Sequence, residues 1–303
     1  MPASVPTAPR RIAVIGGLYA GSERGLTADL LVARALGFAG VPVCTQLVMA
    51  GGGRVTDVTD VPTDTVAAQI DHTFATGAIA GVKVGILAGH QTAEVVLDAC
   101  DAFGVPVVLD LVASGPSGET VLSSQGIDAV AARLSIPRLV TISKADAELV
   151  TGGEIASLDD AQVAAQRIVN RGARHVVIRL GRLPYRFYDA ADDPGGADAG
   201  AADAGGTNEN GSGPPPFSFD LAYDGEDFAL FEAPLLPEPT PEGGSSAFAV
   251  AALAGLLNGL APDEALQRAK RYVTEALRQA RPGPDGGLPL LNAAWEDARA
   301  SRW

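Results

Sequence analysis

Short apolar runs alternate along most of this chain with longer stretches whose apolar residues recur at helical spacing. The run at 11–15 predicts a buried strand that stops at Gly16-Gly17, and the stretch at 27–37 predicts the helix that follows it. The same two patterns then repeat, predicting strands at 41–48, 81–87, 106–110, 138–142 and 175–179 and helices at 62–75, 92–103, 127–134, 145–150 and 159–171. Strands that are apolar on both faces and separated by helices are typical of parallel sheets. We therefore predict an α/β fold with a central, mostly parallel sheet flanked by helices on both faces.

The alternation stops near residue 190. Residues 191–216 are Gly, Ala, Asp, Pro, Ser, Thr and Asn with a single Glu, so we expect a disordered insert there rather than a catalytic lid. Beyond it, Asp224-Gly225 predicts a hairpin, and two helices close the pattern at 245–257 and 262–279. These boundaries predict a disordered leader at 1–10, one domain at 11–281 that carries the insert, and a C-terminal extension at 282–303.

Composition excludes several classes of function. The chain has 36 Asp and Glu against 22 Lys and Arg, a formal charge of −14, which argues against binding to nucleic acid or to an anionic membrane. Two distant cysteines and three scattered histidines give neither a disulfide framework nor a zinc motif. The apolar run at 247–257 is too short to span a bilayer, and the N-terminus lacks the apolar segment of a signal peptide. We therefore expect a cytoplasmic protein.

Candidate chemistry lies where the predicted strands end, because ligands bind at the carboxyl edge of such sheets. The polar residues at these ends are Tyr19, Gln46, Lys83, Asp110, Ser143, Asp146 and Arg179. Asp110 either faces the site, for metal or phosphate, or caps a loop. We interpret Lys83 as a side chain that extends past its apolar neighbours to water.

The segment Glu242-Gly-Gly-Ser-Ser246 opens an Ala-rich helix. Glycines before a helix allow an anion to approach the free N–H groups of its first turn, which favours phosphate binding. An ordinary serine cap with flexible glycines is the alternative. Neither the dinucleotide-binding pattern GxGxxG nor the nucleotide-binding pattern GxxxxGK[ST] is present.

Several segments together resemble the hydroxymethylpyrimidine/phosphomethylpyrimidine kinases of the ribokinase superfamily. The similar segments run in family order from about residue 11 to 281 and are 28–45, 82–87, 106–110, 147–152 and 264–274. The resemblance implies a ribokinase-like fold, use of Mg-ATP, phosphorylation of a small hydroxymethyl heterocycle or other small alcohol in thiamine biosynthesis, and a homodimer.

The resemblance also implies roles for individual residues. Gly243, Gly244 and Ser245 match the family's anion hole for the nucleotide phosphate, and Ser246 stands where the family has the Cys or Asp that acts as base. Asp110 and Asp146 match positions that organise magnesium, although Ser143 replaces the Asn that precedes Asp146 in the family motif. The substrate pocket would be formed by Gly17, Tyr19, Ala50, Ile86 and Val112.

Two of these matches depart from the family in the substrate pocket, where Tyr19 replaces an Asp and Ala50 replaces a Gln that bind the pyrimidine. At the base position, an unassisted serine hydroxyl is a poor proton acceptor. Glu242 is a candidate substitute base. The sequence therefore leaves two hypotheses open: an active kinase with a changed pocket, or a catalytically impaired paralogue that binds a small molecule or regulates a partner. A pyridoxal-kinase-like activity is a third, weaker alternative.

Overall fold

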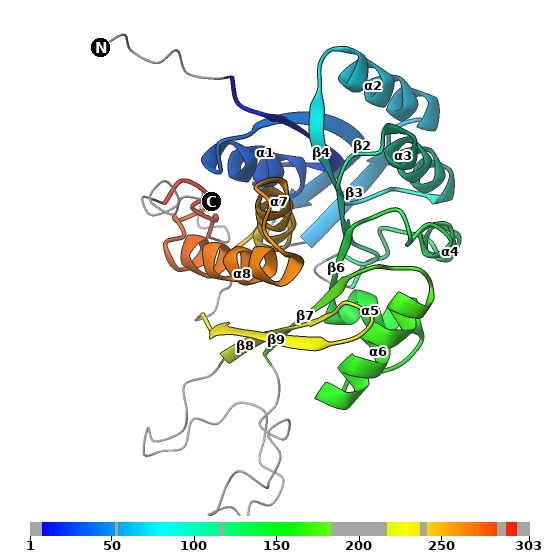
Figure 1. Cartoon of the computed structure of the whole chain (residues 1–303). Coiled ribbons are helices and arrows are strands. Elements are labelled where there is room, and N and C mark those ends of the chain that lie inside the picture. The colour runs from blue at the N-terminus through cyan, green and yellow to red at the C-terminus, as the bar shows by residue number, and fades with distance from the viewer. Residues whose placement is uncertain are drawn as a thin grey trace, which may run out of the picture.

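The computed structural model describes residues 8–51, 54–115, 118–182, 217–236, 241–283 and 289–295. Within these ranges the strands form one nine-stranded sheet in the order β3-β2-β1-β4-β5-β6-β7-β8-β9 (Figure 1). The strands are β1 (Arg11–Ala20), β2 (Ala39–Gly51), β3 (Arg54–Asp60), β4 (Ile79–Val84), β5 (Val107–Leu111), β6 (Leu139–Ser143), β7 (Val176–Arg182), β8 (Phe217–Tyr223) and β9 (Phe228–Pro234).

The sheet is parallel through its centre and antiparallel at both edges. Each neighbouring pair from β2 through β1, β4, β5 and β6 to β7 is parallel. Strand β3 runs antiparallel to β2, and β8 and β9 form the predicted hairpin, in which Tyr223 pairs with Phe228. The prediction of a mostly parallel sheet is confirmed.

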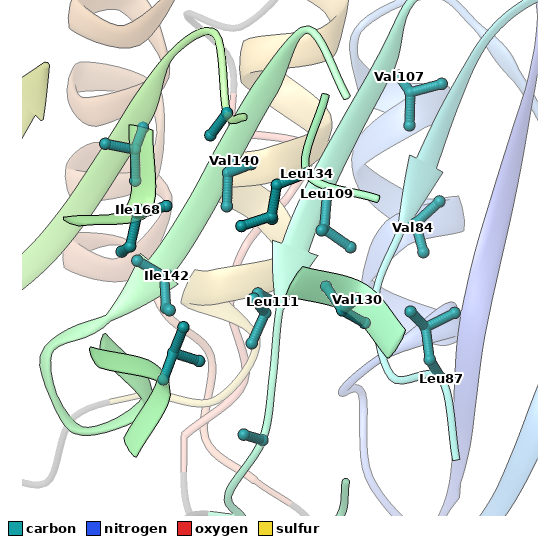
Figure 2. Close-up of a cluster of buried hydrophobic side chains, with 14 of the residues drawn as sticks. Val84, Leu87, Val107, Leu109, Leu111, Val130, Leu134, Val140, Ile142 and Ile168 are labelled. Carbon is teal, nitrogen blue, oxygen red and sulfur yellow. The ribbon is translucent and has the colours of Figure 1, made fainter. Parts of the chain in front are cut away.

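Helices cover both faces of this sheet (Figure 1). One face carries α1 (Leu26–Ala35), α7 (Gly244–Leu257) and α8 (Pro262–Arg278), and the other carries α2 (Thr63–Ala75), α3 (His90–Phe103), α4 (Ser124–Ala131), α5 (Lys144–Thr151) and α6 (Leu158–Asn170). Because strand side chains alternate, Val108 packs toward α7 on the first face, and Leu109 packs toward the helices α2 to α6 on the second face. Figure 2 shows part of the apolar cluster on the second face.

Helix α7 is the most deeply buried helix of the first layer. Its residues from Ser246 to Leu256 are all buried, because the sheet, α1 and α8 surround it. A helix that is apolar all round is expected to be buried in this way. Gly255 permits close packing on α8, since a Cβ there would lie 2.8 Å from the Cβ of Ala265.

The predicted ends of two strands are wrong. The strand predicted at 81–87 ends at Val84. Strand β1 does not stop at Gly16-Gly17 but continues to Ala20, with a register shift between these two glycines. The reason is that β2 also continues, and supplies a partner as far as Met49, opposite Ala20. Strand β3, which pairs with this extension, was not predicted.

The predicted insert at 191–216 lies outside the described residues, as do residues 1–7 of the leader. Part of the C-terminal extension packs on the first layer, where the Tyr272 hydroxyl donates to the Ala293 carbonyl at 2.8 Å and Trp295 is buried. The division into leader, domain and extension stays a prediction. No helix within the described ranges has the length and apolarity to cross a bilayer.

Candidate active site

A cavity of about 430 Å³ opens at the carboxyl ends of the central strands. Its walls come from β1, the ends of β4, β5, β6 and β7, and the N-terminus of α7. The residues singled out from the sequence that line it are Gly17, Tyr19, Lys83, Ile86, Asp110, Val112, Ser143, Asp146, Arg179, Glu242, Gly243, Ser245 and Ser246. Gln46, Ala50 and Gly244 are not in its lining. The cavity lies where the sheet topology predicts a ligand.

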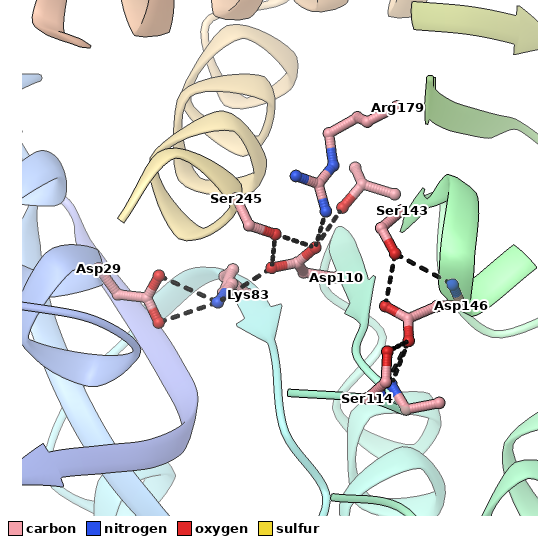
Figure 3. Close-up of polar contacts among 10 residues, drawn as sticks. Asp29, Lys83, Asp110, Ser114, Ser143, Asp146, Arg179 and Ser245 are labelled. Carbon is pink, nitrogen blue, oxygen red and sulfur yellow. Dashed lines mark hydrogen bonds and ion pairs between the residues drawn. The ribbon is translucent and has the colours of Figure 1, made fainter. Parts of the chain in front are cut away.

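Asp110 is held in the cavity by hydroxyl groups and faces two cations (Figure 3). The hydroxyl of Ser245 donates to both of its carboxylate oxygens, at 3.0 and 2.9 Å, and the hydroxyl of Thr141 donates to Oδ1 at 2.9 Å. Arg179 Nη2 lies 3.6 Å from Oδ1 and Lys83 Nζ lies 3.9 Å from Oδ2. Of the two interpretations of Asp110, the structure therefore supports the one that places it in the site.

Lys83 does not reach water. Its side chain is 2% exposed, and its Nζ lies 3.0 Å from both carboxylate oxygens of Asp29 on α1. The interpretation of Lys83 as a snorkelling side chain is wrong, because β4 is a central strand covered on both faces. The Lys83 ammonium group instead lies between two buried carboxylates, those of Asp29 and Asp110 (Figure 3).

Asp29 is a site residue that sequence reasoning missed. It is fully buried, and burial raises the pKa of its carboxyl to about 6, while the Lys83 charge acts in the opposite direction. A signal was available, because this acidic residue stands among the apolar positions Ala28, Val32 and Ala33, which the structure buries. A buried carboxylate requires a partner, and the buried Lys83 was the residue to pair with it.

Asp146 is fixed by a second set of donors at the opposite wall. Its Oδ1 accepts from the Ser114 hydroxyl at 2.7 Å and from the Ser114 and Ala113 backbone N–H groups at 2.8 and 3.2 Å. The Ser143 hydroxyl donates to Oδ2 at 2.8 Å, and Ser143 also caps α5 by accepting from the Asp146 N–H. These contacts tie the ends of β5 and β6 together around one carboxylate (Figure 3).

The N-terminus of α7 faces the cavity with free backbone donors. The helical hydrogen-bond ladder begins where the Ala247 N–H donates to the Gly243 carbonyl, so the N–H groups of residues 244–246 precede it. The N-cap is Gly243 at φ 90°, and no side chain caps the helix. The alternative of an ordinary serine cap is therefore wrong, and the helix end is suited to bind an anion.

Glu242, beside this helix end, is already paired. Its Oε1 lies 2.8 Å from Arg24 Nη2, and its Oε2 accepts from the Ser22 hydroxyl at 2.5 Å. Both oxygens therefore hold the segment before α1 against the segment before α7.

Tyr19 provides an apolar wall on the β1–β2 side. It is 8% exposed and clusters with Val48, Ile86 and Val121, and its burial raises the pKa of the phenol. Ala50, absent from the cavity lining, packs against this cluster instead.

The donor set of the cavity is compatible with magnesium. Mg²⁺ is usually held by one or two carboxylates together with substrate phosphates and water, and Asp110 and Asp146 supply two carboxylates in one cavity. Among the described residues no cluster of three or more His, Cys, Asp or Glu forms a dedicated cage. The two carboxylates of the cavity therefore fit a magnesium ion.

Comparison with known proteins identifies a kinase family. The family model described as phosphomethylpyrimidine kinase matches residues 20–289. The hydroxymethylpyrimidine/phosphomethylpyrimidine kinase of Aquifex aeolicus is 29% identical over 269 residues, covering 88% of this chain and 94% of the relative.

Solved structures show the same fold. The pyridoxal kinase from Staphylococcus aureus in complex with AMP-PCP has a TM-score of 0.77 at 24% identity, covering 95% of this chain and 94% of its own. The phosphomethylpyrimidine kinase from Clostridium difficile has a TM-score of 0.68 at 20% identity, covering 88% and 99%. The expected ribokinase-like fold is thereby confirmed. With a family model that matches most of its length, the chain belongs to the phosphomethylpyrimidine kinase family.

Proposed function

We propose that this protein transfers the γ-phosphoryl group of ATP to the hydroxymethyl group of a small heterocycle, as in the pyrimidine phosphorylation steps of thiamine biosynthesis. The observation that carries the proposal is the position of the α7 N-terminus, whose free N–H groups share one cavity with Asp110, Lys83 and Arg179. Phosphoryl transfer depends mainly on positioning and on neutralising charge, and these groups supply both.

Each wall of the cavity has its own part in this reaction. The N–H groups of Ser245 and Ser246 would receive the oxygens of the transferred phosphoryl group, and Arg179 would neutralise part of its charge. Asp110 and Asp146 would hold Mg²⁺, which supplies neutralisation of the phosphate charge when it is bound with the nucleotide. The Ser245 hydroxyl fixes the orientation of the Asp110 carboxylate.

The acceptor substrate would lie against Tyr19 and Ile86. Gly17 and Val112 complete this side of the cavity, so the wall is mainly apolar and aromatic and suits the flat ring of a heterocycle. Because Tyr19 stands in place of the family's Asp, recognition of the ring would rely more on packing than on a charged contact.

The other hypothesis, a catalytically impaired paralogue, has no support among the described residues or the relatives. Asp110, Asp146 and the first turn of α7 all line the cavity, and their hydrogen bonds are formed. We further expect the protein to work in the cytoplasm, where its free cysteines Cys44 and Cys100 would stay reduced.

The experiment that tests the function is an ADP-release assay with Mg-ATP and a panel of hydroxymethylpyrimidine, its monophosphate, pyridoxal-type vitamers and sugars. We expect turnover with a hydroxymethyl heterocycle and a phosphorylated product by ³¹P NMR. Absence of turnover over the whole panel, with an active relative as control, would contradict the proposal.

Gly243→Ala tests the role of the α7 N-terminus. Gly243 has φ 90°, and a Cβ there would lie 3.2 Å from the Glu23 carbonyl oxygen, so alanine displaces the first turn. We expect kcat to fall by about 100-fold or more, as for the loss of a donor to the transition state. Gly259→Ala is the matched control, because Gly259 has φ 86° with open space at the other end of α7, and this variant should keep its activity.

A further inference from the structure

Asp220 is a buried carboxylate that has no part in the proposed reaction so far. It belongs to β8, its side chain is 6% exposed, and Lys270 Nζ on α8 lies 3.0 Å from its Oδ2. Both residues are outside the lining of the cavity. Burying an ion pair costs desolvation and seldom adds to stability, so a pair in the core suggests a use other than packing.

Asp220 lies beside Arg179, which does line the cavity. The two residues are register partners in the antiparallel pair of β7 and β8. Side chains of such partners project to the same face of the sheet, with Cβ atoms about 5 Å apart. The face is that of α7 and α8, because Val177 and Ala222, each two residues along the same strand, belong to the core cluster of that layer.

Arg179 therefore has a carboxylate on each side. Toward β5, its Nη2 lies 3.6 Å from Asp110 Oδ1 (Figure 3). This separation exceeds the about 2.7–2.9 Å of a direct hydrogen bond between a guanidinium and a carboxylate. Arg179 Nε is buried and has no hydrogen-bond partner among the described residues, so no bond at that atom fixes the group. The position of the guanidinium therefore depends on the two carboxylates beside it.

This arrangement is part of a row of alternating charges across one face of the sheet. In order from α1 to α8, the row consists of Asp29, Lys83, Asp110, Arg179, Asp220 and Lys270. Its three negative and three positive charges cancel. If the charge of Asp220 were removed, Asp110 would be the one carboxylate of the row left beside Arg179.

We propose that Asp220 is a positioning residue: it holds the Arg179 guanidinium away from Asp110, so that Arg179 can neutralise the transferred phosphoryl group. This inference rests on the proposed kinase activity. Lys270 ties the Asp220 carboxylate to α8 and so keeps it in place. Without the Asp220 charge, the guanidinium would move onto Asp110 and form a direct ion pair. That shift would withdraw the cation from the phosphoryl group and occupy a carboxylate assigned to Mg²⁺.

The first test is a crystal structure of the Asp220→Asn variant beside one of the wild-type protein. Asparagine keeps the shape of aspartate and removes its charge. We expect Arg179 Nη2 to approach Asp110 Oδ1 from 3.6 Å to about 2.9 Å in the variant. A folded D220N protein whose guanidinium keeps its wild-type distance from Asp110 would overturn the inference.

The second test is a double-mutant cycle with Arg179→Ala. In the wild-type background, D220N should lower kcat by about tenfold or more and leave KM for the acceptor nearly unchanged, because Arg179 acts on the phosphoryl group. In the R179A background, the same change should alter kcat by less than about twofold, since the positioned cation is gone. Equal losses in both backgrounds would mean that Asp220 acts through the fold, and would overturn the inference.

Tyr272→Phe is the matched control for a buried polar contact of α8. The Tyr272 hydroxyl donates to the Ala293 carbonyl at 2.8 Å, away from the cavity lining. Its loss should lower the midpoint of urea unfolding and leave kcat nearly unchanged. A fall in kcat as large as that of D220N would assign the effect to disturbed packing of α8 and overturn the inference.

Failure of the inference can be told from failure of the proposed function. An active wild-type protein with equal losses in both backgrounds would overturn the role of Asp220 alone. A wild-type protein that turns over no member of the substrate panel would overturn both proposals.

Discussion

At the scale of single residues, the site depends on one lysine shared by two carboxylates. Lys83 is the only cation within 4 Å of Asp29 among the described residues, and it also faces Asp110, so its removal would leave negative charge buried without its partner. Breaking a buried pair from one side is costly, because the remaining charge is neither hydrated nor neutralised.

We predict that Lys83→Met lowers the free energy of unfolding by about 3–5 kcal/mol. Urea unfolding with linear extrapolation measures this change. Lys144→Met is the control, since Lys144 pairs with Glu148 on the exposed side of α5 and its loss should cost less than about 1 kcal/mol. Similar small losses in both variants would show that the buried pair contributes little to the fold.

Some residues of the site could be predicted from the sequence and others could not. Asp110, Asp146 and the segment before α7 could be found, because strand ends and a glycine-rich helix start are local patterns. The pairing of Asp29 with Lys83 could not, since it joins two elements far apart in sequence. The burial of Lys83 follows from β4 being a central strand, which is a property of the sheet order.

At the scale of elements, the packing of α7 on α8 depends on a glycine. Gly255 has ordinary helical geometry, yet a Cβ there would lie 2.8 Å from the Ala265 Cβ and 3.0 Å from its Cα. The two helices approach so closely that only a hydrogen fits between them.

We predict that Gly255→Ala destabilises the protein by about 1–3 kcal/mol, the usual cost of overpacking, although alanine is the better helix former. Chemical unfolding measures the effect. Gly89→Ala provides the comparison, because nothing lies within 4 Å of a Cβ at Gly89, and it should change stability by less than about 1 kcal/mol. A stabilised G255A protein would contradict the tight contact.

Most elements could be predicted from periodicity, including the helices α7 and α8, and the Asp224-Gly225 turn predicted the hairpin of β8 and β9. Strand β3 could not, because its sequence, Arg-Val-Thr-Asp-Val-Thr-Asp, is largely polar and its pairing with β2 gives it order. The prediction that β1 ends at Gly16-Gly17 was wrong because it also neglected pairing with β2. Glycines commonly end strands, but here long-range pairing with β2 carries β1 past them.

At the scale of the whole molecule, the extended β1–β2 segment exposes an apolar surface. Leu18 and Leu47 are register partners and Met49 lies two residues further along β2, and these side chains are 40%, 41% and 36% exposed. Two copies of the chain could cover this surface, which agrees with the homodimer that the family resemblance implies.

We predict a homodimer of about twice 30.8 kDa by light scattering after size-exclusion chromatography. Leu47→Asp should shift it toward monomer, because a buried unpaired charge at the interface is costly. Leu230→Asp is the control, since Leu230 is 44% exposed on β9 at the opposite edge of the sheet. A monomeric wild-type protein would contradict the prediction.

The burial of α7 affects how the protein should lose its activity on heating. The amides proposed to receive the phosphoryl group begin a helix that fills the centre of one core layer, so their positions depend on the part of the protein that should open last. Fraying this helix end would expose the core of that layer. Heat should therefore produce no folded but inactive species: the curve for loss of activity and the curve for loss of secondary structure will coincide.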